Sequence, residues 1–372
     1  QVTCGTQILH SGAFHPSAFV LHKYGRTKGR VQTGSTHVDD FTPGRLLDRL
    51  KMHLAFCCIL LCANLCWAST DGHPENLDVL MDNVVVLRVP QTEGSMVEVP
   101  LTCGEDYQSK AVFWRKNGRE LVPPLIGNKV KVLVKEMNGG NYTCHLSSNG
   151  EYLNHTMVLV QPDQNNRTVI LEEISPDQGY IHCSALNYKG SFHCTWTKTQ
   201  FRSHAAVLLV RAERFMEEIP CELDADGAGV RCQDTNCPYS EEQQPISLTL
   251  YMSSYFRMEA YTKSFYLREI VSPDKLPNLQ VSDGKVFTWD YPDSWEKPCS
   301  FFGLQFQVNL VPHGHPCSSE ELIANKTTDK TEYEVNVKTK KYVFCVRAQD
   351  KYTQGPWNPW STCIVNKHEV KC

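Results

Sequence analysis

The 372-residue sequence lacks several features that would place it in other classes of protein. After residue 68 it has no apolar stretch of about twenty residues, and residues 365–372 are polar, so we expect neither a membrane anchor nor a lipid-anchor signal. It also lacks an excess of basic charge. Without residues 1–68, 30 basic and 38 acidic side chains remain, a net charge of −8, which argues against a nucleic-acid partner.

Catalytic and metal-binding patterns are missing as well. Histidine and serine residues are scattered over expected strands, without a nucleophile elbow or a metal-spaced pair. We therefore predict no enzyme activity, no cofactor and no metal. A zinc site from Cys232, Cys237 and His313 or His315 is the metal alternative, but four ligands at finger spacing are missing and export favours disulfides.

The first part of the chain is not expected to fold. Residues 1–51 show no clear apolar period and no export signal, so we interpret them as a non-native, disordered upstream segment. Residues 52–68 start at Met52, carry a short apolar stretch and end at small residues, which is typical of a signal peptide. An internal signal anchor is the alternative, although the stretch is short for a membrane span.

Cysteine is plentiful, and it indicates the compartment. The sequence has 17 cysteines, of which twelve follow residue 68, far too many for a reducing environment. Four glycosylation sequons agree with export: Asn141, Asn154, Asn166 and Asn325. We predict a secreted, extracellular glycoprotein.

From Leu77 onward the apolar residues come in short bursts separated by Gly, Asn and Pro, which is typical of β-sandwiches. A chain of this length needs two or three domains. In the first, expected over residues 69–162, Cys103, Trp114 and Cys144 follow the order of an immunoglobulin domain, whose two cysteines bridge the sheets. Position 142 supplies the corner tyrosine of that fold.

A second sandwich is expected over residues 163–272. Cys183 and Cys194 close a short loop, and Trp196 stands two residues beyond the second cysteine, which resembles the signature of the cytokine-receptor homology module. Three further cysteines, at 221, 232 and 237, cannot all pair with one another, so one of them must pair elsewhere.

A third sandwich is expected over residues 273–372, after a stiff linker that contains Pro273 and Pro277. Its strand at 342–350 places Phe344 and its alternate neighbours on one face, and Cys345 and Arg347 on the other.

The segment WNPWS follows this strand. Trp357, Trp360 and Ser361 resemble the WSxWS box of cytokine receptors, with Asn358 in place of its first serine. We expect Arg347 to insert between the two rings, where each cation–π contact contributes roughly 0.5 to 2 kcal/mol. The alternative is that both tryptophans are ordinary core residues.

These features together resemble one family over the whole of residues 69–372, the interleukin-12 beta-subunit family. The strings that carry the resemblance are YTCHLSS, CSALNYKGSFHCTW, CQDTNCP, SFYLREIVSPDKLPNLQV, WDYPDSW and RAQDKY. It implies an all-β chain with an immunoglobulin-like sandwich followed by two fibronectin type III sandwiches. It also implies a secreted subunit that holds a four-helix alpha chain in an interleukin-12 or interleukin-23 type heterodimer, with the first domain facing a cell-surface cytokine receptor.

The resemblance also assigns residues. Cys237 matches the family's interchain cysteine, which leaves Cys221 and Cys232 to bridge each other. Asp350 and Tyr352 match a loop at the elbow between the last two domains, where the family captures an arginine of the alpha chain. The alternatives are that Cys237 pairs inside the chain, for example with Cys232, and that Asp350 is a solvated turn residue.

Two aromatic positions match the sides of that pocket, Tyr188 and Phe301, although Phe301 lacks the family's hydroxyl. In the last domain we favour a bridge between Cys345 and Cys363, with Cys299, Cys317 and Cys372 as additional cysteines. The rival functions are a soluble receptor or decoy that binds a helical cytokine reversibly, and a homodimer of this chain.

Overall fold

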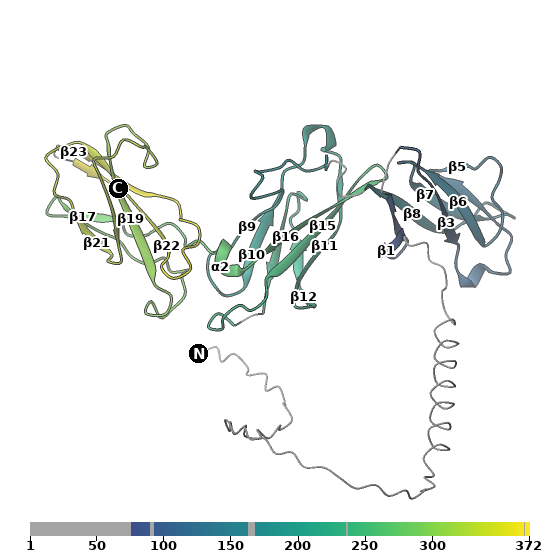
Figure 1. Cartoon of the computed structure of the whole chain (residues 1–372), viewed down its shortest axis with the longest axis horizontal. Coiled ribbons are helices and arrows are strands. Elements are labelled where there is room, and N and C mark those ends of the chain that lie inside the picture. Colours follow the sequence, from purple (N-terminus) through teal and green to yellow (C-terminus); the bar gives the residue numbers. More distant parts are fainter. Residues whose placement is uncertain (1–75, 90–92, 163–167, 236, 368) are drawn as a thin grey trace, which may run out of the picture. The chain divides into compact units, whose positions relative to one another are not determined.

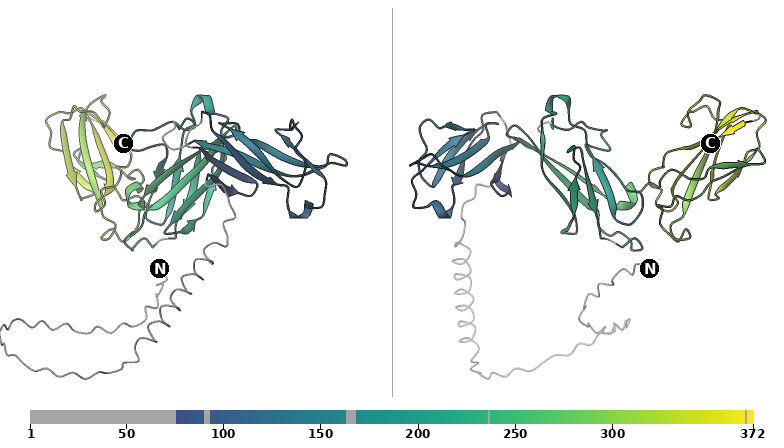
Figure 2. Two further views of the ribbon diagram at one scale, coloured as in Figure 1. Left: turned by 45° about the vertical axis from the view of Figure 1, so that its right-hand side comes forward. Right: turned by 180° about the vertical axis from the view of Figure 1, so that it is seen from behind.

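A computed structural model describes residues 76–372 except 90–92, 163–167, 236 and 368 (Figure 1). The expected upstream segment, the expected signal peptide and the sequon at Asn166 lie outside the described residues. Residues 76–372 form one compact unit, and strands make up nearly all of its regular structure. The predicted all-β class is therefore confirmed. Figure 2 shows the layers of strands from two further directions.

The first sandwich packs a large sheet against a two-stranded one. The large sheet contains β1 (Leu77–Met81), β2 (Val84–Val89), β4 (Val112–Lys116), β5 (Arg119–Glu120), β7 (Gly140–Leu146) and β8 (Tyr152–Pro162). The small sheet pairs β3 (Met96–Thr102) with β6 (Lys129–Lys135), and the 3-10 helix η1 (Glu105–Tyr107) follows β3. Alternate residues of the small sheet, such as Val99 and Val132, are buried against Trp114 and the Cys103–Cys144 disulfide.

A second apolar cluster joins the first sandwich to the next one. Leu159 of β8 packs with Met258 and Phe256, and β16 pairs with β8 at Arg257 and Val160. Gly139 allows this approach, because a Cβ there would lie 2.8 Å from the Cβ of Phe256. The turn before β16 therefore docks on the first sandwich.

The second sandwich also has two sheets. One continues the large sheet of the first sandwich past β8 and contains β11 (Ala206–Arg214), β12 (Glu217–Ile219), β15 (Ile246–Ser254) and β16 (Arg257–Phe265). The other contains β9 (His182–Ser184), β10 (Ser191–Thr195), β13 (Cys221–Leu223) and β14 (Gly229–Gln233), and the 3-10 helix η2 (Gln200–Arg202) precedes β11. Two disulfides staple the second sheet between directly opposite residues, Cys183–Cys194 and Cys221–Cys232.

The connection to the third sandwich contains a turn of helix that the sequence did not predict, α2 (Leu267–Ile270). Its amino-terminal N–H groups find their acceptor in a residue that is distant in the sequence. The Glu242 carboxylate accepts hydrogen bonds from the amides of Leu267 (2.8 Å) and Arg268 (3.1 Å). The extended residues after α2 carry the two linker prolines. Domain boundaries at residues 162 and 272 stay predictions.

The third sandwich encloses an aromatic core that includes Phe287, Trp289, Phe306 and Phe344. Its smaller sheet contains β17 (Gln280–Ser282), β18 (Val286–Thr288) and β21 (Glu332–Glu334). Its larger sheet contains β19 (Leu304–Pro312), β20 (Ala324–Thr328), β22 (Tyr342–Asp350), β23 (Ser361–Asn366) and β24 (Glu369–Lys371). The rings of Phe287 and Phe344 stack at 3.9 Å across the two sheets.

The predicted bridge between Cys345 and Cys363 is wrong. Cys345 pairs with Cys317, and Cys363 pairs with Cys372. The reason is register: Cys363 lies opposite Phe344 on β22, so its side chain points to the face opposite to that of Cys345. Cys363 would have to lie one residue further along the strand pair to share a face with Cys345, so the observed register rules out the bridge that chain order suggested.

The WNPWS segment packs on the outer face of this sandwich. The Arg347 guanidinium lies 4.8 Å from the ring centroid of Trp357 and 4.3 Å from that of Trp360. Asn358, which replaces a serine of the box, is 2% exposed. Its side chain accepts a hydrogen bond from the Ala348 amide (2.7 Å) and donates one to the carbonyl of Asp274 (2.6 Å), so it ties the linker to β22.

Replacing Arg347 with methionine should lower the free energy of unfolding of the third sandwich by roughly 1 to 3 kcal/mol, because two cation–π contacts are lost while the aliphatic stem is kept. The check is the thermal midpoint of the secreted chain, with Lys326→Met, at an exposed position of β20, as the matched control. Equal midpoints for the two variants would mean that the tryptophans are held by core packing alone.

Candidate functional site

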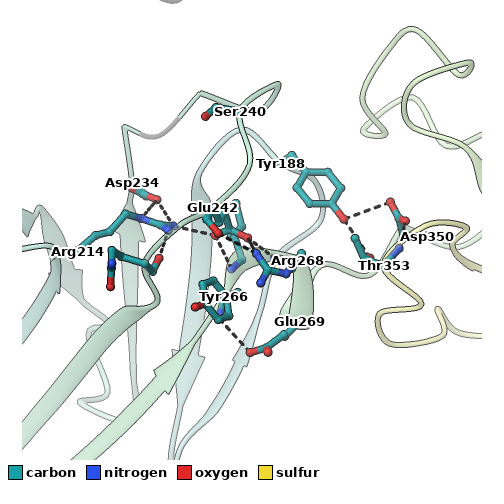
Figure 3. Close-up of polar contacts among 12 residues, drawn as sticks. Tyr188, Arg214, Asp234, Ser240, Glu242, Tyr266, Arg268, Glu269, Asp350 and Thr353 are labelled. Atoms are coloured by element: carbon teal, nitrogen blue, oxygen red, sulfur yellow. Dashed lines mark hydrogen bonds and ion pairs between the residues drawn. The ribbon is translucent and has the colours of Figure 1, made fainter. Parts of the chain in front are cut away.

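A cleft of about 650 Å³ lies where residues of the second and third sandwiches meet, and we call it the elbow cleft. It is lined by four of the five residues predicted to bind a partner: Tyr188, Phe301, Asp350 and Tyr352. Figure 3 shows Tyr188 and Asp350 pointing toward each other, with Glu242 and Arg268 on the adjoining side.

Asp350 is the anionic centre of the elbow cleft. It is the last residue of β22 rather than part of a loop, and only 3% of it is exposed, so the solvated-turn alternative is wrong. One carboxylate oxygen accepts hydrogen bonds from the amides of Tyr352 (2.7 Å) and Thr353 (2.8 Å). The other accepts one from the Tyr188 hydroxyl (3.1 Å). No cation forms an ion pair with Asp350 among the residues that the structure describes.

Aromatic rings form the wall next to this carboxylate. Tyr188 stacks on Phe302 at 5.6 Å and meets Trp295 edge-on at 6.0 Å. Burial raises the pKa of Tyr188, and the neighbouring Asp350 adds to the effect, so the phenol stays protonated and remains a donor. Tyr239, whose hydroxyl donates to the carbonyl of Lys297 (3.0 Å), packs 5.5 Å from Phe301.

A buried charge network holds the adjoining segment in place. The Arg214 guanidinium lies 2.7 Å from the Asp234 carboxylate and 2.9 Å from that of Glu242. Burial opposes the charge of Arg214, but its hydrogen bonds to these two carboxylates outweigh burial and raise its pKa. Because Glu242 also binds the start of α2, the network links β11, the segment after Cys237 and the linker.

Cys237 lies directly before Pro238 and Tyr239, which line the elbow cleft. Cys237 is disulfide-bonded, and Cys232 is not its partner, because Cys232 pairs with Cys221. Its interchain role stays a prediction. The free cysteine of the described residues is Cys299, which is exposed beside the cleft residue Ser300.

The remaining predicted residues lie away from the elbow cleft. Asn141, Asn154 and Asn325 occur on β7, β8 and β20, and their occupancy by glycan stays a prediction. Within the described part of the chain, no cluster of His, Cys, Asp and Glu could hold a metal ion. The same part contains no helix that is long and apolar enough to cross a membrane.

Sequence reasoning missed the other nine residues that line the cleft, among them Tyr239, Glu241, Glu242 and Phe302. The exposed Glu241 adds a second carboxylate to its rim. The charge and aromatic content of residues 238–242 was the available signal, because the predicted cysteine precedes it directly. The arrangement combines a buried carboxylate, an acidic rim and aromatic faces, so its chemistry suits a guanidinium or an ammonium group.

Comparison with known proteins agrees with the resemblance. The family described as "Cytokine interleukin-12p40 C-terminus" matches residues 178–254. The protein named interleukin-12 subunit beta from Marmota monax is 30% identical over 310 residues, which cover 76% of this chain and 91% of that protein. The proteins of the same name from Homo sapiens and Felis catus are each 29% identical, over 73% and 76% of this chain and 87% and 91% of theirs. With this identity over nearly the full length of these relatives, the chain belongs to the interleukin-12 subunit beta family.

Proposed function

We propose that this chain is the secreted beta subunit of an interleukin-12 or interleukin-23 type heterodimer. In this proposal a four-helix alpha chain inserts a basic side chain into the elbow cleft. A thiolate of that chain then attacks the existing disulfide of Cys237, which forms the interchain bond and releases the former partner of Cys237 as a thiol. The heterodimer then signals through cell-surface cytokine receptors. The chain is a cytokine subunit and not an enzyme, in keeping with its family.

The observation that carries the proposal is the buried carboxylate of Asp350, which forms no ion pair with a cation in the described part of the chain. An ionised carboxylate removed from water is costly unless hydrogen bonds or a cation compensate it. Its three hydrogen bonds hold it in one orientation, and a partner's guanidinium would supply the missing charge. Arginine fits better than lysine, because its planar group also stacks on the Tyr188 and Phe301 rings that line the cleft.

The position of the cleft favours a protein partner rather than a small molecule. It is open, it is rimmed by the exposed rings of Phe301 and Tyr352, and it contains the buried carboxylate of Asp350. Aromatic rims around one desolvated anchor are typical of the energetic centre of protein interfaces. A reversible soluble receptor would use the same cleft, so the covalent link is what separates the two functions.

Asp350→Asn should weaken binding of the alpha chain by at least about 30-fold, because the charge is lost while the side chain keeps its shape and its acceptor oxygen. The affinity is measured in a Cys237→Ser background, so that binding is reversible. The matched control is Asp78→Asn, which removes an exposed carboxylate of the first sandwich. Equal affinities for the two variants would contradict the cleft as the binding site.

Cys237→Ser should abolish the reducible heterodimer and leave secretion intact, because the two disulfides of the same domain remain. Non-reducing and reducing gels of medium from cells that co-express an alpha chain provide the measurement. Cys299→Ser, at an exposed thiol, is the matched control and should keep the band. If the band survives Cys237→Ser and disappears in Cys299→Ser, the link belongs to Cys299. If no reducible heterodimer forms with the wild-type chain, the soluble-receptor function is favoured.

A further inference from the structure

The turn between β11 and β12 breaks the usual rules for a hairpin. Its two residues, Phe215 and Met216, are 74% and 89% exposed and have φ angles of 51° and 63°. Two-residue turns with positive φ at both positions normally contain Asn-Gly, since a bulky side chain is strained there. Phe215 and Met216 thus add backbone strain, and the described part of the chain buries little of their surface.

The strand pair beside this turn contains a second conflict. Glu213 lies directly opposite Glu218, and both carboxylates are exposed. Like charges in a cross-strand pair destabilise a hairpin. Neither carboxylate forms an ion pair with another described residue. The tip therefore offers two apolar side chains next to an uncompensated negative charge.

The same domain shows what such a tip does when it has a partner. The hairpin of β15 and β16 also has a two-residue turn, Tyr255–Phe256, with a φ of 55° at Tyr255. Its second residue, Phe256, packs on the first sandwich, whereas Tyr255 lies 4.6 Å from the His204 ring and is itself 75% exposed. At this hairpin, an apolar residue beside a strained position docks on a neighbouring sandwich.

The two tips lie at opposite ends of one sheet. Ala206 of β11 pairs with Ser253, near the Tyr255 turn, whereas Glu213 pairs with Ser247 at the other end of β15. That other end is also the end of the elbow cleft, because Arg214, directly before the turn, binds Glu242, which lines the cleft (Figure 3). The Phe215–Met216 turn therefore lies at the end of the sheet that faces the elbow cleft, one residue from a direct contact of the cleft residue Glu242.

We propose that the Phe215–Met216 turn is a second docking point for the four-helix chain, outside the elbow cleft. It would enter an apolar depression on that chain, and a lysine or arginine at the rim of the depression would lie against Glu213 and Glu218. This inference rests on the proposed function, because it takes the partner that the cleft binds. It explains why strain and like-charge repulsion are retained at an exposed position, since burial of the two apolar side chains offsets the strain and a basic group of the partner neutralises the repulsion.

The test replaces the tip by the sequence that its backbone prefers, Phe215→Asn with Met216→Gly. The free protein should become more stable, with a thermal midpoint higher by on the order of 2 to 4 °C, since strain is removed. Its affinity for the alpha chain should fall roughly tenfold or more in the Cys237→Ser background. If the turn had only a structural role, a substitution that raises the stability of the free protein would not weaken its binding of the alpha chain.

Two further variants complete the design. Glu218→Lys leaves the turn unchanged and pairs Glu213 across the hairpin, so it should stabilise the protein and weaken the complex. Tyr255→Asn, a substitution at the strained position of the opposite hairpin, is the matched control and should leave affinity unchanged. Unchanged affinity in both tip variants, or a loss of receptor binding alone with normal heterodimer affinity, overturns this inference. The proposed function fails separately, if Asp350→Asn also binds normally.

Discussion

Successive side chains of a β-strand point to opposite faces of its sheet. In β22 this alternation positions core residues, the cleft carboxylate, a disulfide and the arginine stack of the third sandwich. The even-numbered residues from Tyr342 to Asp350 share one face. Phe344 and Val346 on that face fill the core. Asp350 lies on the same face at the end of the strand, where the core meets the elbow cleft. The odd-numbered residues carry the Cys345 disulfide and the Arg347 stack on the other face. Asp350 is buried because it occupies a core position at the open end of a sandwich.

The elbow cleft needs a second restraint, because its other wall comes from a loop. Residues 238–242 follow a short strand and have little regular structure of their own. Glu242 compensates for this: one carboxylate meets Arg214 from β11 and the first amides of α2. A buried carboxylate with these partners is satisfied only in one arrangement of strand, loop and linker. The loop that carries Cys237 and Tyr239 is thereby held beside Asp350, which lies more than a hundred residues away in the sequence.

Sequence patterns and resemblance predicted different parts of this arrangement. Spacing alone gave the sandwiches, since the order Cys103, Trp114, Cys144 and the alternation of apolar residues are local properties. The partner residues came only from resemblance, because Tyr188 and Asp350 belong to different sandwiches and no local pattern pairs them. The bridge of Cys345 was predicted wrongly, because pairing depends on the face of each cysteine, and the face of Cys363 follows from a register that chain order does not fix. Glu242 was missed for the same reason, since its role exists only through three segments that meet in space.

Both hairpin tips of the second sandwich carry residues that their turn conformations disfavour. A free domain would be more stable with Asn-Gly at the Phe215–Met216 turn and with Gly at position 255, and the chain has aromatic or apolar residues instead. At the Tyr255 turn the cost is compensated within the chain, because Phe256 packs against a surface that Gly139 keeps open. At the Phe215 turn nothing described in this chain offers such a surface, although the backbone strain is greater, with two consecutive residues at positive φ. Residues that violate local conformational preferences without compensation in the fold are expected at interfaces. This turn lies at the end of the sheet where the elbow cleft opens.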